Sequence, residues 1–491
     1  MSNLSPKSQT GTNARALILA QLARFTISMG GTTVLSRLLS PDFFGLAAIV
    51  MAVVNIAGIL GDLGLSVVAI RKMELSHKQW SGLFWANAGL GGLIAAVVAG
   101  ISPMVGRFYN DPRVTPLLLA ISSVFLLNGI SVQYRVSLNR EGRFARLAII
   151  ETLAPAIALV VAIVLAIVHP SPWALIAQAI VAPALLLLFS VVSAPQLPNR
   201  PTRNSGVRSL LVSGGVLSAS QVIYAIKSNV GPLALGRFVP DATVGMFSRA
   251  MQLSTMPHMQ LAAPLTRVTV PALSASAETT DFEHQVLKAR AIYGYTVGVA
   301  LALLGGLAVP MVRIMLGPQW MENTPTILAI ATFGALFQSI SYIFYWVLTA
   351  TDQTKYIIRA EGLTGVLVIL GIIIFARYGP TMIAWVYAAG LVVNAFAYSL
   401  YVLPRIGLSI SHFFASAIPN LLVLSLILGG NLLIIRYLPV ETSLTGYFLQ
   451  IGVGLLWAAA ILLIASLAIP RVRNDLQQTF IAVKRIAGIK K

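Results

Sequence analysis

Long apolar stretches alternate with short polar connections along the chain from Ala14 to Pro470. Each stretch can cross a bilayer, because a helix needs roughly 20 mostly apolar residues to span the hydrocarbon core. The stretches are too long, and alternate too little, for the strands of a membrane β-barrel. The pattern therefore predicts an all-α polytopic membrane protein with about 14 transmembrane helices. The expected spans are residues 14–36, 43–70, 80–106, 114–134, 147–168, 172–193, 209–236, 242–266, 289–316, 324–349, 356–376, 381–403, 412–435 and 444–469.

The composition predicts a protein with almost no soluble mass outside the bilayer. Hydrophobic residues make up 57% of the 491 residues and charged residues only 10%, and a soluble protein could not hide so much apolar surface. Residues 1–13 are polar and the first apolar run carries Gln21 and Arg24, so we expect a retained first span and no cleaved signal peptide. The chain has no cysteine, and its five histidines lack ligand spacing, so neither a metal nor a cofactor is expected.

The net charge of +19 indicates membrane topology more than nucleic-acid binding in a chain of this class. Cytoplasmic loops of membrane proteins carry an excess of Lys and Arg. When the N-terminus is placed in the cytoplasm, most of the 34 Lys and Arg residues fall in loops and tails on that side. An even number of spans also returns the basic C-terminal tail to the same side. We therefore expect a multi-pass membrane protein with both termini in the cytoplasm, and no nucleic-acid partner.

The C-terminal tail, residues 471–491, is basic and carries apolar residues at helical spacing. This combination predicts an amphipathic helix that lies on the anionic inner leaflet, so membrane lipids are an expected partner. Binding of a specific partner protein is the alternative. The apolar stripe consists of Val472, Leu476, Phe480 and Val483.

Two segments recur in the second half of the chain, in the same order and beside equivalent spans. Residues 140–153 resemble residues 350–363, and VLSRLLSPDFFG resembles LALGRFVPDATVG, which pairs Gly45 with Gly245. Spans 1–6 and 7–12 are therefore predicted to form related six-helix lobes in the same orientation, which is a transporter design. Chance similarity between apolar helices is the alternative. The predicted divisions are an N-terminal lobe at 1–206, a C-terminal lobe at 207–411, an extra helix pair at 412–470 and a cytoplasmic tail at 471–491.

Charged side chains occur deep inside several predicted spans, where each costs roughly 2.5–3.5 kcal/mol if it faces lipid. They must face water, one another or an anionic ligand. Three of these side chains are cations and one is a carboxylate, and this excess of positive charge predicts an anionic substrate. His258 lies in the same predicted span as one of the cations. The alternatives are a snorkelling Arg24 and a helix–helix ion pair at Asp62. The predicted substrate-binding residues are Arg24, Lys227, Arg249 and Asp62.

Sequence motifs of catalysis are missing from the chain. There is no G-x-x-x-x-G-K-[ST] loop for ATP, no zinc motif and no G-x-S-x-G motif. The chain is therefore predicted not to be an enzyme. Transport would draw its energy from an ion gradient, the membrane potential or the substrate gradient.

Four stretches resemble the bacterial polysaccharide exporters and O-antigen-type flippases of the multidrug/oligosaccharidyl-lipid/polysaccharide (MOP) exporter superfamily, in the exopolysaccharide branch that handles colanic-acid- and succinoglycan-like polymers. One of them reads GRFVPDATVGMFSRAMQLSTMPHMQLAAPLTRVTVPALSA, and another LGPQWMENTPTILAIATFGAL. The resemblance covers roughly residues 15–405, and the last two spans match in hydropathy alone. The other two stretches are residues 36–91 and 108–155.

The resemblance implies two six-helix bundles around a V-shaped, cation-lined cavity in the bacterial inner membrane. It implies that an undecaprenyl-pyrophosphate-linked oligosaccharide, a repeat unit of exopolysaccharide or lipopolysaccharide, moves from the cytoplasmic to the periplasmic leaflet. It also leaves room for contact with the polysaccharide polymerase machinery. Arg249, in the run FSRA, is carried over by the resemblance, whereas Arg24 and Lys227 are assigned by depth. A multidrug antiporter and a membrane-embedded polymerase or glycosyltransferase are the rival hypotheses.

Overall fold

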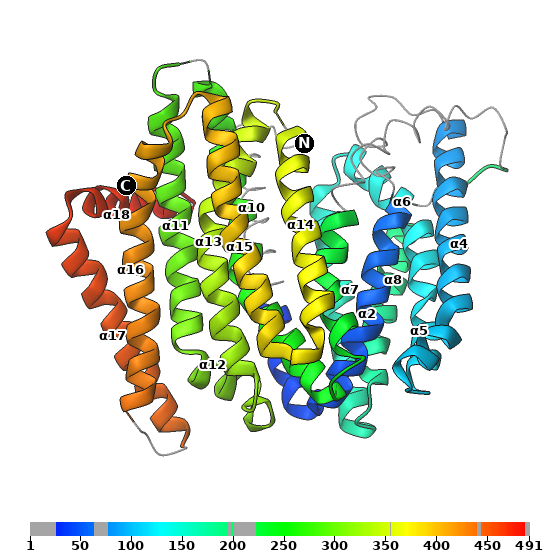
Figure 1. Ribbon diagram of the computed structural model, residues 1–491. Coiled ribbons are helices and arrows are strands. Elements are labelled where there is room, and N and C mark those ends of the chain that lie inside the picture. Colours follow the sequence, from blue (N-terminus) through cyan, green and yellow to red (C-terminus); the bar gives the residue numbers. More distant parts are fainter. Residues whose placement is uncertain are drawn as a thin grey trace, which may run out of the picture. The chain divides into compact units, whose positions relative to one another are not determined.

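The computed structural model describes residues 26–62, 77–194, 198–200, 222–277, 279–353, 355–438 and 443–486. Within these ranges the regular structure is helical, without strands, which confirms the all-α class (Figure 1). The chain forms two compact units, Met1–Gly245 and Met246–Lys491. The lobes expected at 1–206 and 207–411 remain a prediction.

Unit 1 contains long apolar helices joined by short turns. Ser122 separates α5 from α6 within one predicted span, and its hydroxyl donates to the carbonyl of Leu119 at 2.7 Å, a bond that competes with the helical ladder. Helix α7 packs closely on α8 because it buries an alanine on every turn, from Ala154 to Ala166. The helices are residues 26–38, α2 (Pro41–Asp62), α4 (His77–Tyr109), α5 (Val114–Ile121), α6 (Ser123–Arg140), α7 (Phe144–Val168), α8 (Trp173–Ser193) and Val222–Leu235.

Unit 2 is organised around α13. In the most apolar 18-residue stretch of this helix, 72% of the residues are buried. Small residues let its neighbours approach, so that a side chain at Gly334 would overlap Ala388 of α15. In the corresponding stretch of α17 only 17% of the residues are buried, so its apolar surface suits contact with lipid. The helices are α10 (Asp241–Ser276, which begins in unit 1), α11 (Phe282–Gly306), α12 (Ala308–Met315), α13 (Thr324–Ala350), α14 (Lys355–Phe375), α15 (Pro380–Val402), α16 (Ile410–Tyr437), α17 (Leu444–Ala468) and α18 (Pro470–Ile486).

The predicted spans correspond to helices wherever the structure describes them; residues 14–25, 63–70 and 209–221 of three predicted spans lie outside the described residues. Eleven helices of the described part of the chain are long and apolar enough to cross a membrane. The helix over residues 26–38, the helix Val222–Leu235 and α10 fall at the remaining three predicted positions. Helix α10 is longer than the span expected at 242–266, because it runs for 36 residues to Ser276. At 1.5 Å per residue it measures about 54 Å, which exceeds the hydrocarbon thickness of about 30 Å. Its last turns therefore extend beyond a single crossing.

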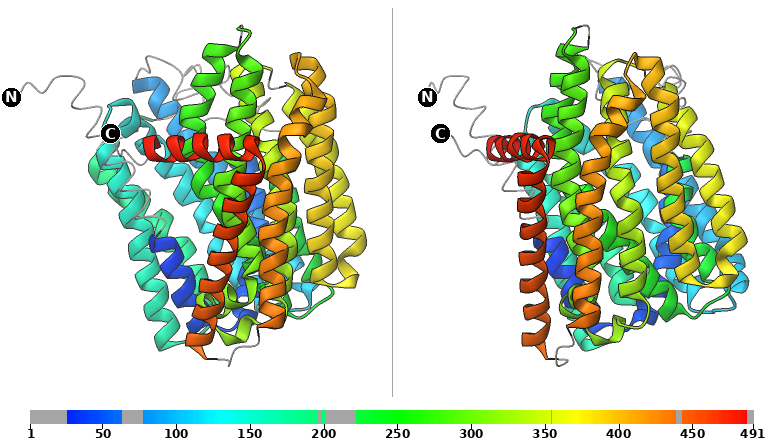
Figure 2. Two further views of the ribbon diagram at one scale, coloured as in Figure 1. Left: turned by 90° about the vertical axis from the view of Figure 1, so that its left-hand side faces the viewer. Right: turned by 60° about the vertical axis from the view of Figure 1, so that its left-hand side comes forward.

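The tail is helical over Pro470–Ile486, follows α17 and lies across α11 (Figure 2). Its predicted apolar stripe is divided between two environments. Val472 is buried and Leu476 packs against the core of unit 2, whereas Phe480 and Val483 are exposed. The first half of α18 is thus docked on protein, and only the second half offers its apolar side chains to a membrane surface.

Candidate functional site

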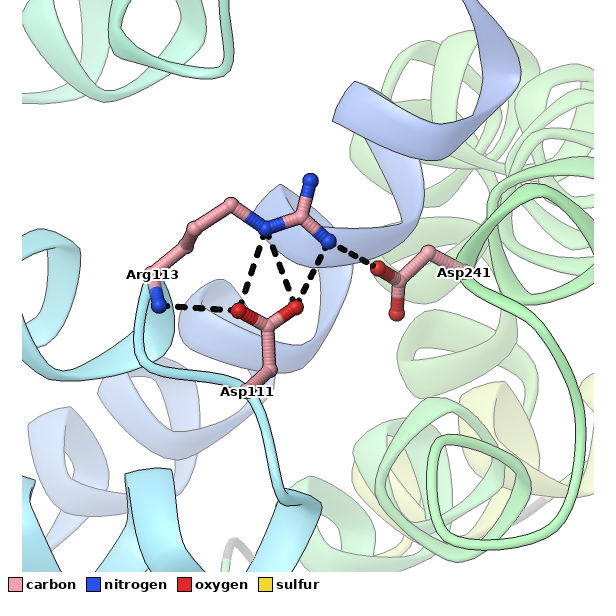
Figure 3. A network of polar contacts seen from close by, with 3 residues as sticks. All are labelled: Asp111, Arg113 and Asp241. Atoms are coloured by element: carbon pink, nitrogen blue, oxygen red, sulfur yellow. Dashed lines mark hydrogen bonds and ion pairs between the residues drawn. The ribbon is translucent and has the colours of Figure 1, made fainter.

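Three charged residues from segments far apart in the sequence meet in unit 1, and we call Asp111, Arg113 and Asp241 the polar clasp (Figure 3). The Arg113 Nη2 atom lies 2.7 Å from Asp111 Oδ2 and 2.9 Å from Asp241 Oδ2. The Arg113 Nε atom also donates to both oxygens of Asp111, at 3.0 and 3.1 Å. One guanidinium therefore bridges two carboxylates.

Local structure positions each member of the clasp. Asn110 ends α4 with a positive φ of 54°, a conformation that Asn tolerates better than most residues. The turn lets the backbone N–H of Arg113 donate to Asp111 Oδ1 at 2.8 Å. Asp241 lies in the first turn of α10, where the helix dipole favours a negative charge. The clasp thus joins the α4–α5 turn to the start of α10.

The two carboxyl groups of the clasp respond to their surroundings in opposite ways. Hydrogen bonds from Arg113 lower the pKa of Asp111 below its usual value. Burial, followed by the charge of Asp111, raises the pKa of Asp241 despite the contact with Arg113. Acidification therefore protonates Asp241 before Asp111. The charge-assisted Arg113–Asp241 contact is present above the raised pKa and weakens as the pH falls through it.

Backbone contact between α2 and α10 accompanies the clasp. A side chain at Gly45 would overlap the carbonyl oxygen of Asp241, and one at Gly245 would overlap that of Pro41. These are the two glycines that the internal repeat pairs. Their reciprocal contact lets the first turns of the two helices cross without intervening side chains.

Polar contacts also connect α2 and α4 to the helix Val222–Leu235. The Asn55 Nδ2 atom donates to Asn229 Oδ1 at 3.0 Å, and the Tyr109 hydroxyl donates to the carbonyl of Leu233 at 2.9 Å. Together with the clasp, these bonds connect helices of the predicted N-terminal lobe to Val222–Leu235 and the start of α10, all within unit 1.

The predicted substrate-binding residues have different outcomes. Arg24 lies outside the described residues, and of Asp62 only the backbone, at the end of α2, is described. Lys227 is half-buried in the helix Val222–Leu235, with its Nζ 5.6 Å from the Tyr224 ring centre. Arg249 lies in α10 and donates to the side chain of Gln252. Substrate binding by these four residues remains a prediction.

His258, which shares α10 with Arg249, lies in the core of unit 2. It is 8% exposed, and its Nδ1 lies 2.8 Å from the Tyr293 hydroxyl and its Nε2 3.3 Å from the carbonyl of Ala335. Tyr342 and Trp346 pack around the pair. These bonds satisfy both ring nitrogens, which is the ordinary state of a buried histidine.

The clasp was missed because its residues occupy turns, where charges are common. One available signal was the Pro-Asp pair that both repeated segments contain, Pro41-Asp42 and Pro240-Asp241. The pairing of Arg113 with Asp241 has no such signal.

Comparison with known proteins places the chain among polysaccharide biosynthesis proteins. A family model described as polysaccharide biosynthesis protein matches residues 34–325. The lipopolysaccharide biosynthesis protein WzxC of Escherichia coli is 25% identical over 341 residues, which cover 68% of each chain. The teichuronic acid biosynthesis protein TuaB of Bacillus subtilis is 23% identical over 75% of this chain and 77% of its own. The succinoglycan biosynthesis transport protein ExoT of Rhizobium meliloti is 21% identical over 63% of each chain.

Solved structures show the same fold. The inward closed conformation of the lipid II flippase MurJ matches with a TM-score of 0.69 and 14% identity, over 91% of this chain and 96% of the other. An inward-facing multidrug resistance MATE family transporter of the MOP superfamily matches with a TM-score of 0.57 and 13% identity, over 80% of this chain and 98% of the other. The chain thus has the fold of MOP superfamily transporters.

Proposed function

The chain belongs to the polysaccharide biosynthesis protein family, and from this premise we propose that it moves a lipid-linked oligosaccharide across the bacterial inner membrane. The observation that carries the proposal is the family match, joined to a fold shared with a lipid II flippase over 91% of the chain. Undecaprenyl pyrophosphate is the proposed lipid carrier. The transported unit belongs to an exopolysaccharide or lipopolysaccharide, as in the names of the relatives.

Transport accounts for the comparisons better than enzymatic activity does. One relative is named a transport protein, and the solved structures are named as a flippase and as transporters. These names agree with the prediction that the chain is not an enzyme. None of them concerns a polymerase, so contact with the polymerase machinery has no support here. A drug antiporter shares the fold, but a cationic drug would require an acidic binding surface.

Alternating access is the proposed mechanism, and the polar clasp would close the periplasmic end. By the charge bias of the loops, the α4–α5 turn and the start of α10 both lie on the periplasmic side. Arg113 is 52% exposed, and exposed ion pairs contribute only about 0.2–1 kcal/mol each. Such weak contacts suit a closure that must open in each cycle, because two alternating states differ by only a few kcal/mol.

Substrate charge sets the roles of the buried cations. A pyrophosphate carries negative charge into the membrane interior, where uncompensated charge is costly. Arg24, Lys227 and Arg249 are the proposed ligands of this pyrophosphate. Asp62 would then bind a counter-ion or orient one of the cations.

A deletion strain tests the function. Without the protein, lipid-linked repeat units are expected to accumulate on the cytoplasmic leaflet, where an added glycosidase reaches them only after the membrane is permeabilised. The wild-type gene on a plasmid should restore polymer at the surface. Accumulation on the periplasmic leaflet would indicate a polymerase instead, and unchanged polymer with increased drug sensitivity would indicate an antiporter.

Topology is tested by single-cysteine labelling, since the chain has no native cysteine. We expect Asn110→Cys, in the turn beside the clasp, to react with an impermeant maleimide in intact spheroplasts. Glu141→Cys, in a loop predicted to be cytoplasmic, is the control and should react only after permeabilisation. The reverse pattern would overturn the orientation on which the clasp's role depends.

A further inference from the structure

A polar cavity lies in unit 2 between α11, α16 and the tail helix α18. Its volume is about 300 Å³, and its lining includes Lys288, Arg290, Arg471, Asn474 and Asp475. A second cavity of about 360 Å³ adjoins it and shares His284, Leu287 and Arg471. The first cavity is lined by more cations than carboxylates. Its cations are Lys288, Arg290 and Arg471, and its carboxylate is Asp475.

Arg290 is the unusual member of this lining. Its side chain is 1% exposed, and its one ion pair among the described residues is a 3.6 Å approach of Nη2 to Asp475 Oδ2, which is too long for a hydrogen bond. The Nε and Nη1 atoms have no hydrogen-bond partner among the described residues. A buried guanidinium is normally paired and hydrogen-bonded. Arg290 therefore presents unused donors at the wall of a cavity.

The donors suit a phosphate group. Guanidinium N–H groups bind phosphate oxygens in a bidentate manner, and Lys288 and Arg471 add positive charge nearby. Two carboxylates oppose an anion here: Asp475 faces Arg290, and Glu283 in the adjoining cavity is held by His412 at 3.0 Å. The cations outnumber these two carboxylates, so the balance of charge still favours an anion.

The position of α18 favours a lipid as the source of that phosphate. Helix α18 follows directly on α17, which is long and apolar enough to cross the membrane, so it begins at the level of the lipid headgroups. Phe480, Ile481 and Val483 are exposed on its second half, where apolar side chains can enter the interface. Basic helices of this kind are attracted to anionic leaflets.

We propose that the cavity between α11, α16 and α18 binds the phosphate of an anionic phospholipid, with Arg290 as its main ligand and Lys288 and Arg471 as supporting charges. The headgroup would join α18 to α11. Anionic lipid would thereby stabilise unit 2, independently of the substrate that the protein transports.

Lipid titration of the purified full-length protein tests this proposal. Thermal unfolding is followed in detergent as phosphatidylglycerol is added, with phosphatidylcholine and inorganic phosphate as the two comparison ligands. We expect phosphatidylglycerol to raise the melting temperature in a saturable way and phosphatidylcholine not to do so. A full effect of inorganic phosphate at the same concentration would overturn the lipid as the source.

Two variants and one control locate the binding site. Arg290→Gln should weaken the response to phosphatidylglycerol about tenfold or more, which is the loss expected for hydrogen bonds to a charged group. Lys288→Gln should weaken this response to a smaller extent. Because Lys288 is less buried than Arg290, this variant also tests the cavity if Arg290→Gln fails to fold. The control is Arg473→Gln, since Arg473 is exposed on α18 and does not line either cavity. Equal weakening by the control would overturn the cavity in favour of diffuse surface attraction, and unchanged binding by both variants would also overturn it.

Discussion

Replacing Arg24 and Arg249 together by alanine is expected to abolish polymer export while the amount of protein in the membrane stays the same. A pyrophosphate requires positive charge inside the bilayer, and each hydrogen bond to a charged group contributes about 1.5–3 kcal/mol. Losing two such ligands reduces binding on the order of 100-fold or more. Surface polymer and membrane abundance are measured in the same cells.

Lysine at either position should restore part of the export, because it returns the charge without the bidentate fork of arginine. The matched control is Arg267→Ala, since Arg267 is an exposed cation on the same helix, α10, as Arg249. We expect the control to export normally. Normal export by the double alanine variant at equal abundance would sink the hypothesis of a cation-lined cavity.

Reversing the charge of Arg113 is the second change with a large expected effect. In Arg113→Glu a third carboxylate joins Asp111 and Asp241, and Asp42 adds its charge from nearby. Repulsion replaces the bridge, so the α4–α5 turn and the first turn of α10 should separate. We expect at least a tenfold loss of export, measured as polymer per cell at equal protein abundance, because the proposed periplasmic closure no longer forms.

A second reversal distinguishes a lost contact from a folding defect. Arg113→Glu combined with Asp241→Arg restores an ion pair of opposite polarity at the same place and should recover part of the export. The control is Arg107→Glu, because Arg107 is exposed in the last turn of α4 and takes no part in the ion pairs of the clasp among the described residues. If Arg113→Glu exports at the wild-type rate, the clasp is not the closing element.

The helices and the class of protein could be predicted from sequence because their causes are local. A run of apolar residues near Leu444–Ala468 predicts a span wherever it packs, and Gly379-Pro380 ends one helix and begins the next by its own backbone preferences. The amphipathic tail was visible for the same reason. The sequence similarity that pairs Gly45 with Gly245 could also be seen without the structure. The reciprocal backbone contacts that these two glycines allow could not.

Tertiary structure decided which polar groups meet. Arg113 and Asp241 are 128 residues apart, and nothing in either neighbourhood selects the other. His258 was indistinguishable in sequence from a residue facing a cavity, and only the packing of Tyr293 and Ala335 around it makes it a satisfied core histidine. Arg290 is a basic residue near the start of α11, and its burial beside Asp475 of α18 cannot be read from either segment alone. Depth in the membrane follows from position along one helix, whereas the partner of a charged side chain depends on which other helices pack beside it.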